Sequence, residues 1–507
     1  MNVTVEPEIR SSGSSKVPIS KLFDAASAVA NTPIAHMLGL LVVYTSLALM
    51  FLRSFYLADP DIWWHLATGR WILAHDALPV TDPFSSYGAD KPLVVYSWLF
   101  DIVMQLLFRS LSYMLAVVYE VALRVALAGA LFRLVHGLLP RFWRAAAITL
   151  ISLYGMSYVI GPRPGMLTIL FGIIELDILL AVRRTGEGKK LWILPLLMLV
   201  WVNWHIQFVY GLMLLGVFAI EPLLARLSFS HPDETDSWPA RQGWLALATT
   251  FLATLLNPYG PRIYSTVFLY MHQPKSFFQI VELRAMTFRV PQNYVVLLLF
   301  LAAALAVGWR RERRLLWPML LAIASVLAFR SVKESWFLVV VSAAALTHGW
   351  HLNISQDVPS LTNRYRLATA VWVAAILFAG FRYYGVSNDF LEIQVNGNFP
   401  SAAARFLEQH HLQGPLYNDF NWGGYLTWRL PELRVAIDGR TNVHGDERVG
   451  HFGDMWLGKP VWATDLELSQ ANIVLANKDK ALTSLLLLDR RFNILYEDVQ
   501  AVIFQRR

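Results

Sequence analysis

Residues 36–65 read HMLGLLVVYTSLALMFLRSFYLADPDIWWH, an apolar run followed by two acidic residues, two tryptophans and a histidine. The run from 36 to 56 is long enough to cross a bilayer as one helix. Extended backbone around Pro60 would let the Asp59 and Asp61 carboxylates approach a common ligand. In the alternative interpretation, the segment is a solvated turn in which Asp61 caps a helix lying at the membrane surface. The stretch alone does not decide between the two.

The rest of the chain is apolar as well. Its 507 residues are 56% hydrophobic and 16% charged, and its mean hydropathy is +0.43. These values are typical of a membrane protein rather than of a soluble domain. Further apolar runs fall near residues 93–108, 112–136, 142–161, 165–182, 191–205, 207–226, 243–257, 293–308, 315–330, 335–349 and 367–385. We therefore expect a polytopic α-helical membrane protein with about 11–12 transmembrane helices between residues 36 and 385.

The charge pattern predicts how the chain is oriented in the membrane. The formal net charge is +7, but the basic residues concentrate in short loops between apolar runs. Two such loops, Arg183–Lys190 and Arg310–Arg314, are therefore expected in the cytoplasm, and nucleic-acid binding is not indicated. Alternation of the helices then puts the first outer loop, 57–92, and the tail outside. Residues 1–35, which are polar and rich in serine, predict a disordered cytoplasmic lead-in.

One part of this topology is inconsistent. With the N-terminus inside and loop 57–92 outside, residues 93–138 must cross the membrane an odd number of times, yet their length suits two helices. The conflict disappears if segment 93–108, which carries Asp101 and Gln105, is re-entrant or lies at the interface.

The topology gathers polar side chains at the outer ends of the helices. Charged groups at membrane depth are costly and usually face a cavity or a partner. Taken singly, each residue is more simply an interfacial anchor, but convergence from several segments favours a site. The set is Asp59, Asp61, His65, Asp82, Arg163, Asn203, His205, Asn257, Tyr259, Glu282, Arg330, Lys333 and Glu334.

These side chains offer three kinds of chemistry. Asp59 or Asp61 can act as a general base or hold a divalent cation such as Mg²⁺ or Mn²⁺ through carboxylate oxygens. The cationic members suit a phosphate group, with lipid headgroups as the alternative partner. His65 and His205 can move protons, although a structural role is simpler for each. The sequence also lacks cysteine and a Walker-type phosphate loop, which argues against thiol chemistry and against an ATP-driven pump. The cationic members are Arg163, Arg330 and Lys333.

The pattern changes after Val386 to that of an α/β domain, expected over residues 386–507 on the extracytoplasmic side. Predicted helices are Pro400–His410, Tyr425–Leu430 and Lys480–Leu488, and predicted strands are Leu416–Tyr417, Leu433–Ile437, Ile473–Ala476, Phe492–Tyr496 and Ala501–Gln505. Polar and aromatic residues follow two of the strand ends, where such folds bind ligands. In the alternative interpretation they only shape turns around a buried aromatic ring. They are Asp419, Trp422, Tyr425, Asp438 and Arg440.

A multi-pass body, Asp59 and Asp61 in the first outer loop, and an α/β tail on the same side resemble the GT-C superfamily of membrane glycosyltransferases. Members of that superfamily take sugars from polyprenyl-phosphate donors, some with a metal ion and some without. The tail is also similar in layout to the catalytic subunit of oligosaccharyltransferases, whose Trp-Trp-Asp-Tyr-Gly motif is absent from residues 418–425.

The resemblance implies an inverting transfer of a sugar from a lipid-linked donor to a glycan, lipid or protein acceptor at the extracytoplasmic face. Asp59 or Asp61 would be the catalytic carboxylate, with a narrow preference for Asp59, and His65 would lie beside them. The expected location is the bacterial inner membrane. The residues expected to bind the donor phosphate are Arg163, His205, Arg330 and Lys333. A transporter or flippase for a lipid-linked or anionic solute and a non-catalytic membrane scaffold are the alternatives.

Overall fold

The computed structural model describes residues 29–53, 58–227, 238–309, 314–349 and 362–507 of the chain. Most of the lead-in predicted over residues 1–35 therefore lies outside the described residues. The same holds for the basic cluster at 310–314 apart from its last residue, Arg314.

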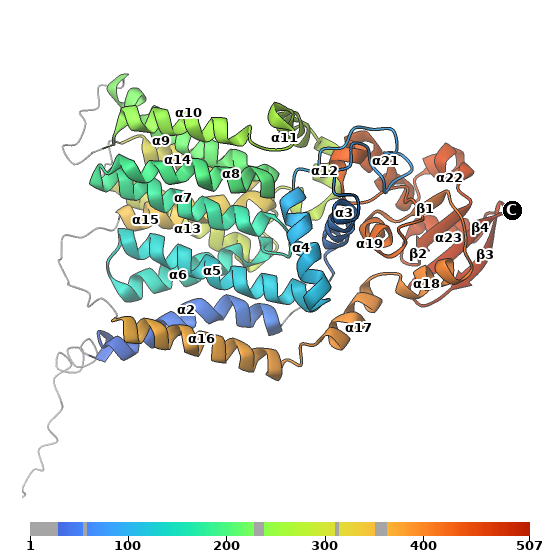
Figure 1. Cartoon of the computed structure of the whole chain (residues 1–507), viewed down its shortest axis with the longest axis horizontal. Helices are drawn as coiled ribbons and strands as arrows, with labels where there is room; N and C mark the ends of the chain where they lie inside the picture. Colours follow the sequence, from blue (N-terminus) through green and yellow to red (C-terminus); the bar gives the residue numbers. More distant parts are fainter. Residues whose placement is uncertain (1–28, 54–57, 228–237, 310–313, 350–361) are drawn as a thin grey trace, which may run out of the picture.

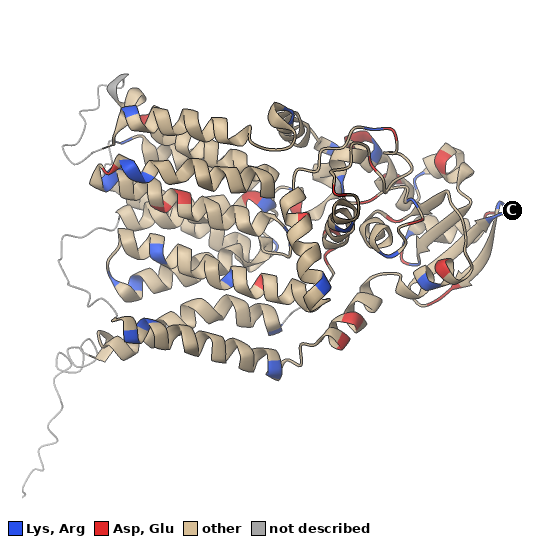
Figure 2. Cartoon of the chain, in the orientation of Figure 1, with Lys and Arg blue, Asp and Glu red and all other residues tan. Residues whose placement is uncertain are grey.

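Helices that lie side by side form the larger part of the molecule (Figure 1). Their side chains are mostly uncharged, and Lys and Arg are found mainly near the ends of the bundle (Figure 2). The helices are α2 (Pro33–Arg53), α5 (Met114–Leu138), α6 (Phe142–Met156), α7 (Gly165–Thr185), α8 (Leu194–Trp204), α9 (Val209–Leu227), α10 (Ala240–Thr254), α13 (Pro291–Trp309), α14 (Leu316–Arg330), α15 (Ser335–Gly349) and α16 (Asn363–Tyr383). The apolar segments predicted from the sequence are thus helical.

The predicted number of membrane spans is not confirmed. Within the described residues, six segments are long and apolar enough to cross a membrane: α2, α5, α7, Ile206–Ala225, α13 and α16. Helices α6, α10, α14 and α15 have 15 residues each. At about 1.5 Å per residue they extend about 22 Å, which is less than a hydrocarbon core of about 30 Å.

The segment for which the predicted topology was inconsistent contains a helix that is not parallel to the bundle helices. Segment 93–108 contains α4 (Trp98–Leu111), which lies across the ends of the bundle helices rather than along them (Figure 1). It packs against α3 (Asp61–His75), which follows the first span. This position agrees with the interfacial alternative for 93–108.

The start of α3 differs from the prediction. Asp61 is the first residue of the helix and does not cap it. Instead the Asp59 Oδ1 atom accepts a hydrogen bond of 2.9 Å from the Asp61 backbone N–H. A carboxylate placed two residues before a free helical N–H satisfies that donor and favours the helix dipole. The alternative interpretation, in which Asp61 caps the helix, is therefore wrong, and Asp59 accepts the hydrogen bond at the helix start instead.

The tail contains a small four-stranded sheet with helices around it. The strands are β1 (Leu416–Asn418), β2 (Ile473–Asn477), β3 (Phe492–Glu497) and β4 (Ala501–Arg506), in the order β1-β2-β4-β3. Strand β1 is parallel to β2, and the other pairs are antiparallel. The helices are α17 (Asn388–Asn398), α18 (Ser401–Gln409), α19 (Phe420–Arg429), α20 (Thr441–His444), α21 (Asp446–Trp456), α22 (Leu466–Gln470) and α23 (Ala481–Leu486).

The predicted strand Leu433–Ile437 is wrong. Its central residue, Val435, forms only an isolated bridge with Ser85 of the first outer loop. The Val435 N–H donates to the Phe84 carbonyl at 3.1 Å, and the Ser86 N–H donates to the Val435 carbonyl at 3.0 Å. The alternating pattern of this segment therefore reflects pairing with a loop about 350 residues earlier in the chain, a partner that local periodicity does not reveal.

A shared hydrophobic cluster joins the tail to α3 and α4. The Trp63 ring lies 5.4 Å from the Tyr425 ring and 4.8 Å from the Trp428 ring, measured between centroids. Leu391, Trp422 and Ile473 belong to the same cluster. Two short helices, α11 (Ile263–Met271) and α12 (Pro274–Gln279), also bring the segment before α13 against the tail. The packing places the tail directly over α3.

Candidate active site

A cavity of about 220 Å³ lies where α3 meets the ends of the bundle helices nearest the tail. It is lined from six places in the chain: α3 and the residues before it, the segment before α4, the turn before α7, the α8–α9 junction, and the 3-10 turns Val281–Leu283 and Val332–Glu334 with the start of α15. Its ionisable and polar side chains include Asp59, Asp61, His65, Tyr96, Arg163, His205, Gln207, Glu282 and Lys333. Most of the predicted site residues of the helical body therefore meet in one cavity.

Arg163 is the centre of this group. Its Nε atom lies 2.6 Å from Asp59 Oδ2, and its Nη1 atom lies 3.2 Å from Asp61 Oδ2. The same Nη1 atom donates a short hydrogen bond to Glu282 Oε1, which also accepts one of 3.2 Å from Lys333 Nζ. Three carboxylates thus surround two cations, and the guanidinium is held in a fixed orientation.

The Asp61 and Glu282 carboxyls differ in pKa because their surroundings differ. Burial raises the pKa of Asp61 to about 6, helped by the nearby charge of Asp59 and opposed by Arg163. Burial would also raise the pKa of Glu282, but Lys333 and Arg163 lower it to about 2. Glu282 is therefore a permanent anion, whereas Asp61 gains and loses a proton near neutral pH.

His65 and His205 form the buried floor of the cavity. His65 Nδ1 lies 2.5 Å from Asp101 Oδ1, and the His65 ring stacks on Trp64 at a centroid distance of 3.5 Å. Burial lowers the pKa of His65 and raises the pKa of Asp101. His205 Nδ1 lies 2.9 Å from Thr168 Oγ1. Both imidazoles are thus fixed by a second side chain.

A second cavity, of about 710 Å³, adjoins the first and extends beneath the tail. Asp61, Arg163, Glu282 and Lys333 line both cavities, whereas Asp59 lines only the smaller one. The tail contributes residues from the start of α19, from the segment before α20, and from α21 and the start of α23: Asp419, Phe420, Asn421, Gly439, Thr441, Trp456 and Lys480. The Asp61–Arg163 pair therefore lies where the two cavities meet.

Two glycines of the tail allow this close approach. A Cβ atom on Gly424 would lie 2.5 Å from the Pro60 carbonyl oxygen, and one on Gly439 would lie 2.2 Å from Asp61 Oδ1. Real Cβ atoms do not approach other atoms so closely. Glycine at these positions lets α19 and the segment before α20 press directly against the start of α3.

Arg330 is not part of this group. It lines neither cavity; its Nη2 atom donates to the Met271 carbonyl at 3.1 Å, and its guanidinium lies 4.9 Å from the Phe277 ring centroid. The predicted phosphate role of Arg330 is therefore not supported by its position. The cation of this segment that does line the cavity is Lys333, three residues later in the turn after α14.

The predicted tail site divides into three parts. Trp422 and Tyr425 are buried in the cluster around Trp63 and carry the packing of α19. Asp419 caps α19, with its Oδ1 atom accepting from the Asn421 N–H at 2.9 Å, and it borders the larger cavity. Of these three predicted residues, only Asp419 therefore borders a cavity.

Asp438 and Arg440, the remaining tail residues, form a buried ion network with Asp82 of the first outer loop. Arg440 Nη1 lies 2.6 Å from Asp82 Oδ1, and Arg440 Nη2 lies 2.5 Å from Asp438 Oδ2. Asp82 and Asp438 are fully buried, and His444 also contacts Asp438. Burial opposes ionisation, yet Arg440 and His444 lower the pKa of Asp438. The network links loop 57–92 to the tail.

Replacing Arg440 by methionine is expected to destabilise the protein by about 3–5 kcal/mol, because two buried carboxylates lose their cation. Thermal unfolding of the purified protein in detergent measures the change. Arg429→Met is the matched control, because Arg429 pairs with Glu408 at the surface of the tail and surface pairs contribute about 0–1 kcal/mol. Equal losses in the two variants would contradict the structural role of the network.

The predicted divalent cation has no ready site in this arrangement. Carboxylate oxygens are the ligands that Mg²⁺ and Mn²⁺ prefer, but those of Asp59, Asp61 and Glu282 all point to Arg163. Within the described ranges, no group of three or more His, Asp or Glu side chains is arranged to hold a metal ion. The mechanism proposed below therefore includes no step through a metal.

Several residues in or next to the cavity were not assigned a role from the sequence. Glu282 is 119 residues from Arg163 in the chain. Asp101, on the helix whose placement was in conflict, does not line the cavity but contacts His65, which does. Tyr96, whose hydroxyl lies 3.0 Å from that of Tyr270, is a third. The signal for Glu282 and Asp101 was their position as acidic residues in otherwise apolar segments, but their partners come from contacts that only the fold supplies.

No model of a known protein family matches the chain, and no curated protein matches it. Among solved structures, it is similar to the oligosaccharyltransferase of Archaeoglobus fulgidus tethered with an acceptor peptide containing the NVT sequon. That match has a TM-score of 0.49 and 9% identity over 88% of this chain and 69% of that chain. The apo form of the same enzyme matches with a TM-score of 0.47 and 11% identity over the same shares.

Proposed function

We propose that this protein is a membrane glycosyltransferase that moves a sugar from a polyprenyl-phosphate donor to an acceptor hydroxyl. The observation that carries the proposal is the junction of the two cavities, where Asp61, Arg163 and Lys333 meet beside a helical body of apolar surface. A base and two cations at one point suit a reaction that removes a proton and releases a phosphate. The acceptor is a glycan, lipid or protein that enters beneath the tail.

In the proposed reaction, the acceptor oxygen attacks the anomeric carbon of the donor sugar. A new C–O bond forms as the bond between that carbon and the phosphate oxygen breaks, so the configuration inverts. The Asp61 carboxylate takes the hydroxyl proton. The leaving polyprenyl phosphate takes the bonding electrons, and its growing charge is stabilised by Arg163 and Lys333.

The geometry favours Asp61 over Asp59 as the base. Both carboxylates have contacts to both oxygens, but those of Asp59 are shorter, at 2.9 Å to the Asp61 N–H and 2.6 Å to Arg163 Nε, than those of Asp61, at 3.2 Å to Trp64 Nε1 and 3.2 Å to Arg163 Nη1. The Asp61 side chain is 23% exposed against 14% for Asp59, and it borders both cavities. We assign Asp59 to orient Arg163, whose described contacts use Nε and Nη1 and leave Nη2 for a phosphate oxygen.

The test of the proposal is sugar transfer by the purified full-length chain in liposomes. A panel of radiolabelled polyprenyl-phosphate sugars is supplied in one leaflet only, and the label is followed into organic-soluble, protein and glycan fractions and into the opposite leaflet. We expect label to move to one acceptor class with release of polyprenyl phosphate. Passage of the intact donor across the bilayer, without cleavage of the sugar–phosphate bond, would identify a flippase instead and would overturn the proposal.

The transfer rate is expected to depend on pH through Asp61. Because a base must be deprotonated, kcat/KM should rise with pH to a plateau above about 6, the pKa of this carboxyl. The Asp59 charge raises that pKa, so Asp59→Asn should move the midpoint to lower pH. A profile measured between pH 4 and about 9 under constant ionic strength tests this; a midpoint that Asp59→Asn does not move would contradict the assignment.

We further propose that the tail lies outside the cell and the Arg183–Lys190 loop inside, with the protein in a bacterial inner membrane. The proposal rests on the basic residues of that loop. A cysteine placed at Gln505 should react with a membrane-impermeant maleimide in intact cells, whereas one at Glu187 should react only after permeabilisation. The chain has no cysteine of its own, so labelling is specific. Equal labelling of both sites in intact cells would reverse the scheme.

A further inference from the structure

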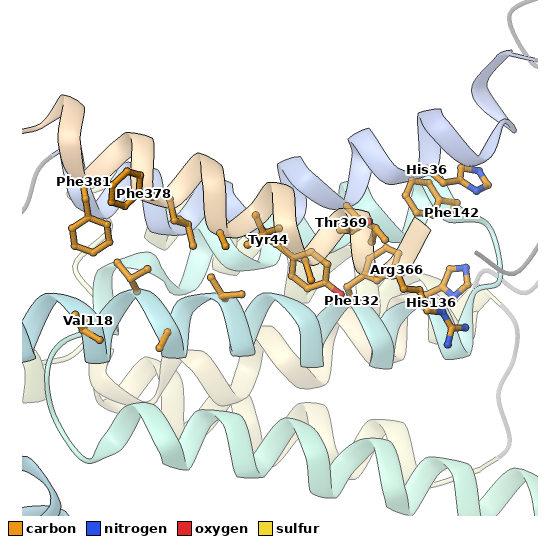
Figure 3. A pocket seen from close by; sticks show the side chains of 18 residues that line it. His36, Tyr44, Val118, Phe132, His136, Phe142, Arg366, Thr369, Phe378 and Phe381 are labelled. Carbon is orange, nitrogen blue, oxygen red and sulfur yellow. The ribbon is translucent and has the colours of Figure 1, made fainter. Parts of the chain in front are cut away.

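A third cavity is larger than the two at the candidate active site and shares no lining residue with them. It has a volume of about 1110 Å³ and lies between α2, α5 and α16 (Figure 3). Helix α16 packs on α2, but the cavity separates it from α5. Its volume exceeds the range of about 300–1,000 Å³ that is usual for small-molecule pockets.

The cavity is apolar along most of its length and polar at one end. Aliphatic and aromatic side chains such as Val118, Phe378 and Phe381 line one end, and His36, His136 and Arg366 lie at the other (Figure 3). Arg366 is the only permanently charged residue of the lining, which includes no acidic side chain among the described residues. A long apolar channel that ends in a single cation has the chemistry of an anionic lipid site.

Two buried polar groups point to the same end. His36 is 2% exposed and stacks on Phe142, yet its Nε2 atom has no hydrogen-bond partner in the described part of the chain. The Nε2 atom of His136, which stacks on Phe132, also has none among the described residues. Unpaired buried polar atoms are costly, and these two add to the polarity of the end of the cavity that carries Arg366.

The cavity extends far enough for a lipid tail. Arg366 and Phe381 lie at its two ends on α16, and at about 1.5 Å per residue they are about 22 Å apart along the helix. One leaflet of the hydrocarbon core is about 15 Å thick. An acyl chain that starts at Arg366 can therefore remain beside α16 over its whole length.

The polar end faces away from the donor site. His36 lies near the start of α2, whereas Asp59 follows its end. Arg184 donates a hydrogen bond to the Gly137 carbonyl, next to His136, so the polar end of the cavity is the end that carries the basic loop. Under the proposed topology this is the cytoplasmic leaflet, which is rich in anionic lipid. A donor whose phosphate binds Arg163 has its charged end at the opposite side of the membrane.

We propose that this cavity is a binding site for an anionic membrane phospholipid, with an acyl chain between α5 and α16 and its headgroup phosphate at Arg366. The lipid fills the space between α16 and the rest of the bundle and so fixes a helix that leads directly into the tail through α17. The site is separate from the proposed sugar-transfer centre and does not depend on it.

The test uses the full-length protein extracted in mild detergent from vesicles of equal phosphatidylglycerol and phosphatidylcholine. Native mass spectrometry counts the lipids that remain bound. We expect the wild-type protein to retain phosphatidylglycerol and Arg366→Ala to retain about tenfold less, because a charge-assisted contact is lost. Arg364→Ala is the matched control: it removes an exposed cation from the same turn of α16 that does not line the cavity.

A second pair of variants tests the apolar part. Ala374→Trp fills the channel and should lower phosphatidylglycerol retention, whereas the neighbouring Ala375→Trp, outside the lining, should not. Each variant is accepted only if it elutes as the wild-type protein does in size-exclusion chromatography. Equal retention by wild type and Arg366→Ala, an equal loss in Arg364→Ala, or displacement of the phospholipid by added polyprenyl phosphate would each overturn the proposal.

Discussion

Asp61→Asn is expected to lower kcat/KM for sugar transfer by about 10³-fold, within the range that general bases contribute. The amide keeps the size of the side chain and can still accept the hydrogen bond from Trp64 Nε1 that now reaches Asp61 Oδ1 at 3.2 Å. It cannot accept a proton from the acceptor. The loss should therefore appear in kcat, with an unchanged thermal unfolding midpoint, in single-turnover transfer with saturating lipid-linked donor.

Asp59→Asn separates the base from the residue that orients Arg163. It should also reduce transfer, because the 2.6 Å contact from Arg163 Nε loses its charge, but the acidic limb of the pH profile should persist at a lower midpoint. In Asp61→Asn that limb should vanish. If Asp59→Asn abolished the limb and Asp61→Asn kept it, the two carboxylates would have to exchange roles, as the sequence alone had favoured.

Arg163→Ala is expected to lower kcat/KM by about 10²–10³-fold, the usual effect of removing one donor that stabilises charge in a transition state. The substitution also removes the cation that holds Asp59, Asp61 and Glu282 together. Since Arg163 lowers the pKa of Asp61, the residual activity should have its midpoint above pH 6. Arg163→Lys should recover only part of the rate, because an ammonium cannot contact two carboxylates with a planar fork.

Arg330→Ala is the control for Arg163→Ala. Both residues were predicted to bind phosphate, but Arg330 contacts the Met271 carbonyl and the Phe277 ring outside the cavities. Its removal should leave kcat/KM within about twofold of wild type, since a substitution outside the site changes no group that touches the donor. Equal losses in the two variants would mean that the donor phosphate lies nearer α14 than the cavity suggests.

The helical body could be predicted because its elements are local. Apolar runs of the required length became α5, α7, α13 and α16 almost residue for residue. What failed depends on distant contacts. The segment around Val435 alternates like a strand, but it pairs with Ser85. The sequence left the placement of 93–108 open between two alternatives, and the contact of α4 with α3 agrees with the interfacial one. The boundary placed at residue 386 remains a prediction.

The candidate site was only partly predictable, for a similar reason. Counting helices from basic loops indicated which residues share a membrane face, and seven of the predicted ones line the cavity: Asp59, Asp61, His65, Arg163, His205, Glu282 and Lys333. A count of helices cannot tell which residues on that face lie close to one another. It therefore included Arg330, and it read Asp438 and Arg440 as a binding edge although they belong to a buried network with Asp82.

The tight fit of Gly424 and Gly439 against Pro60 and Asp61 has a consequence for biosynthesis. The proposed base is made early in translation, but the surface that encloses it is made last, after every helix of the bundle has been inserted. In a polypeptide released before α19 is made, Asp61 and Arg163 would lie in a solvent-exposed site. Hydrolysis of a lipid-linked sugar by water would compete with transfer there. If the protein is the proposed glycosyltransferase, a nascent or clipped chain therefore lacks the enclosed site that would favour transfer over hydrolysis of the donor.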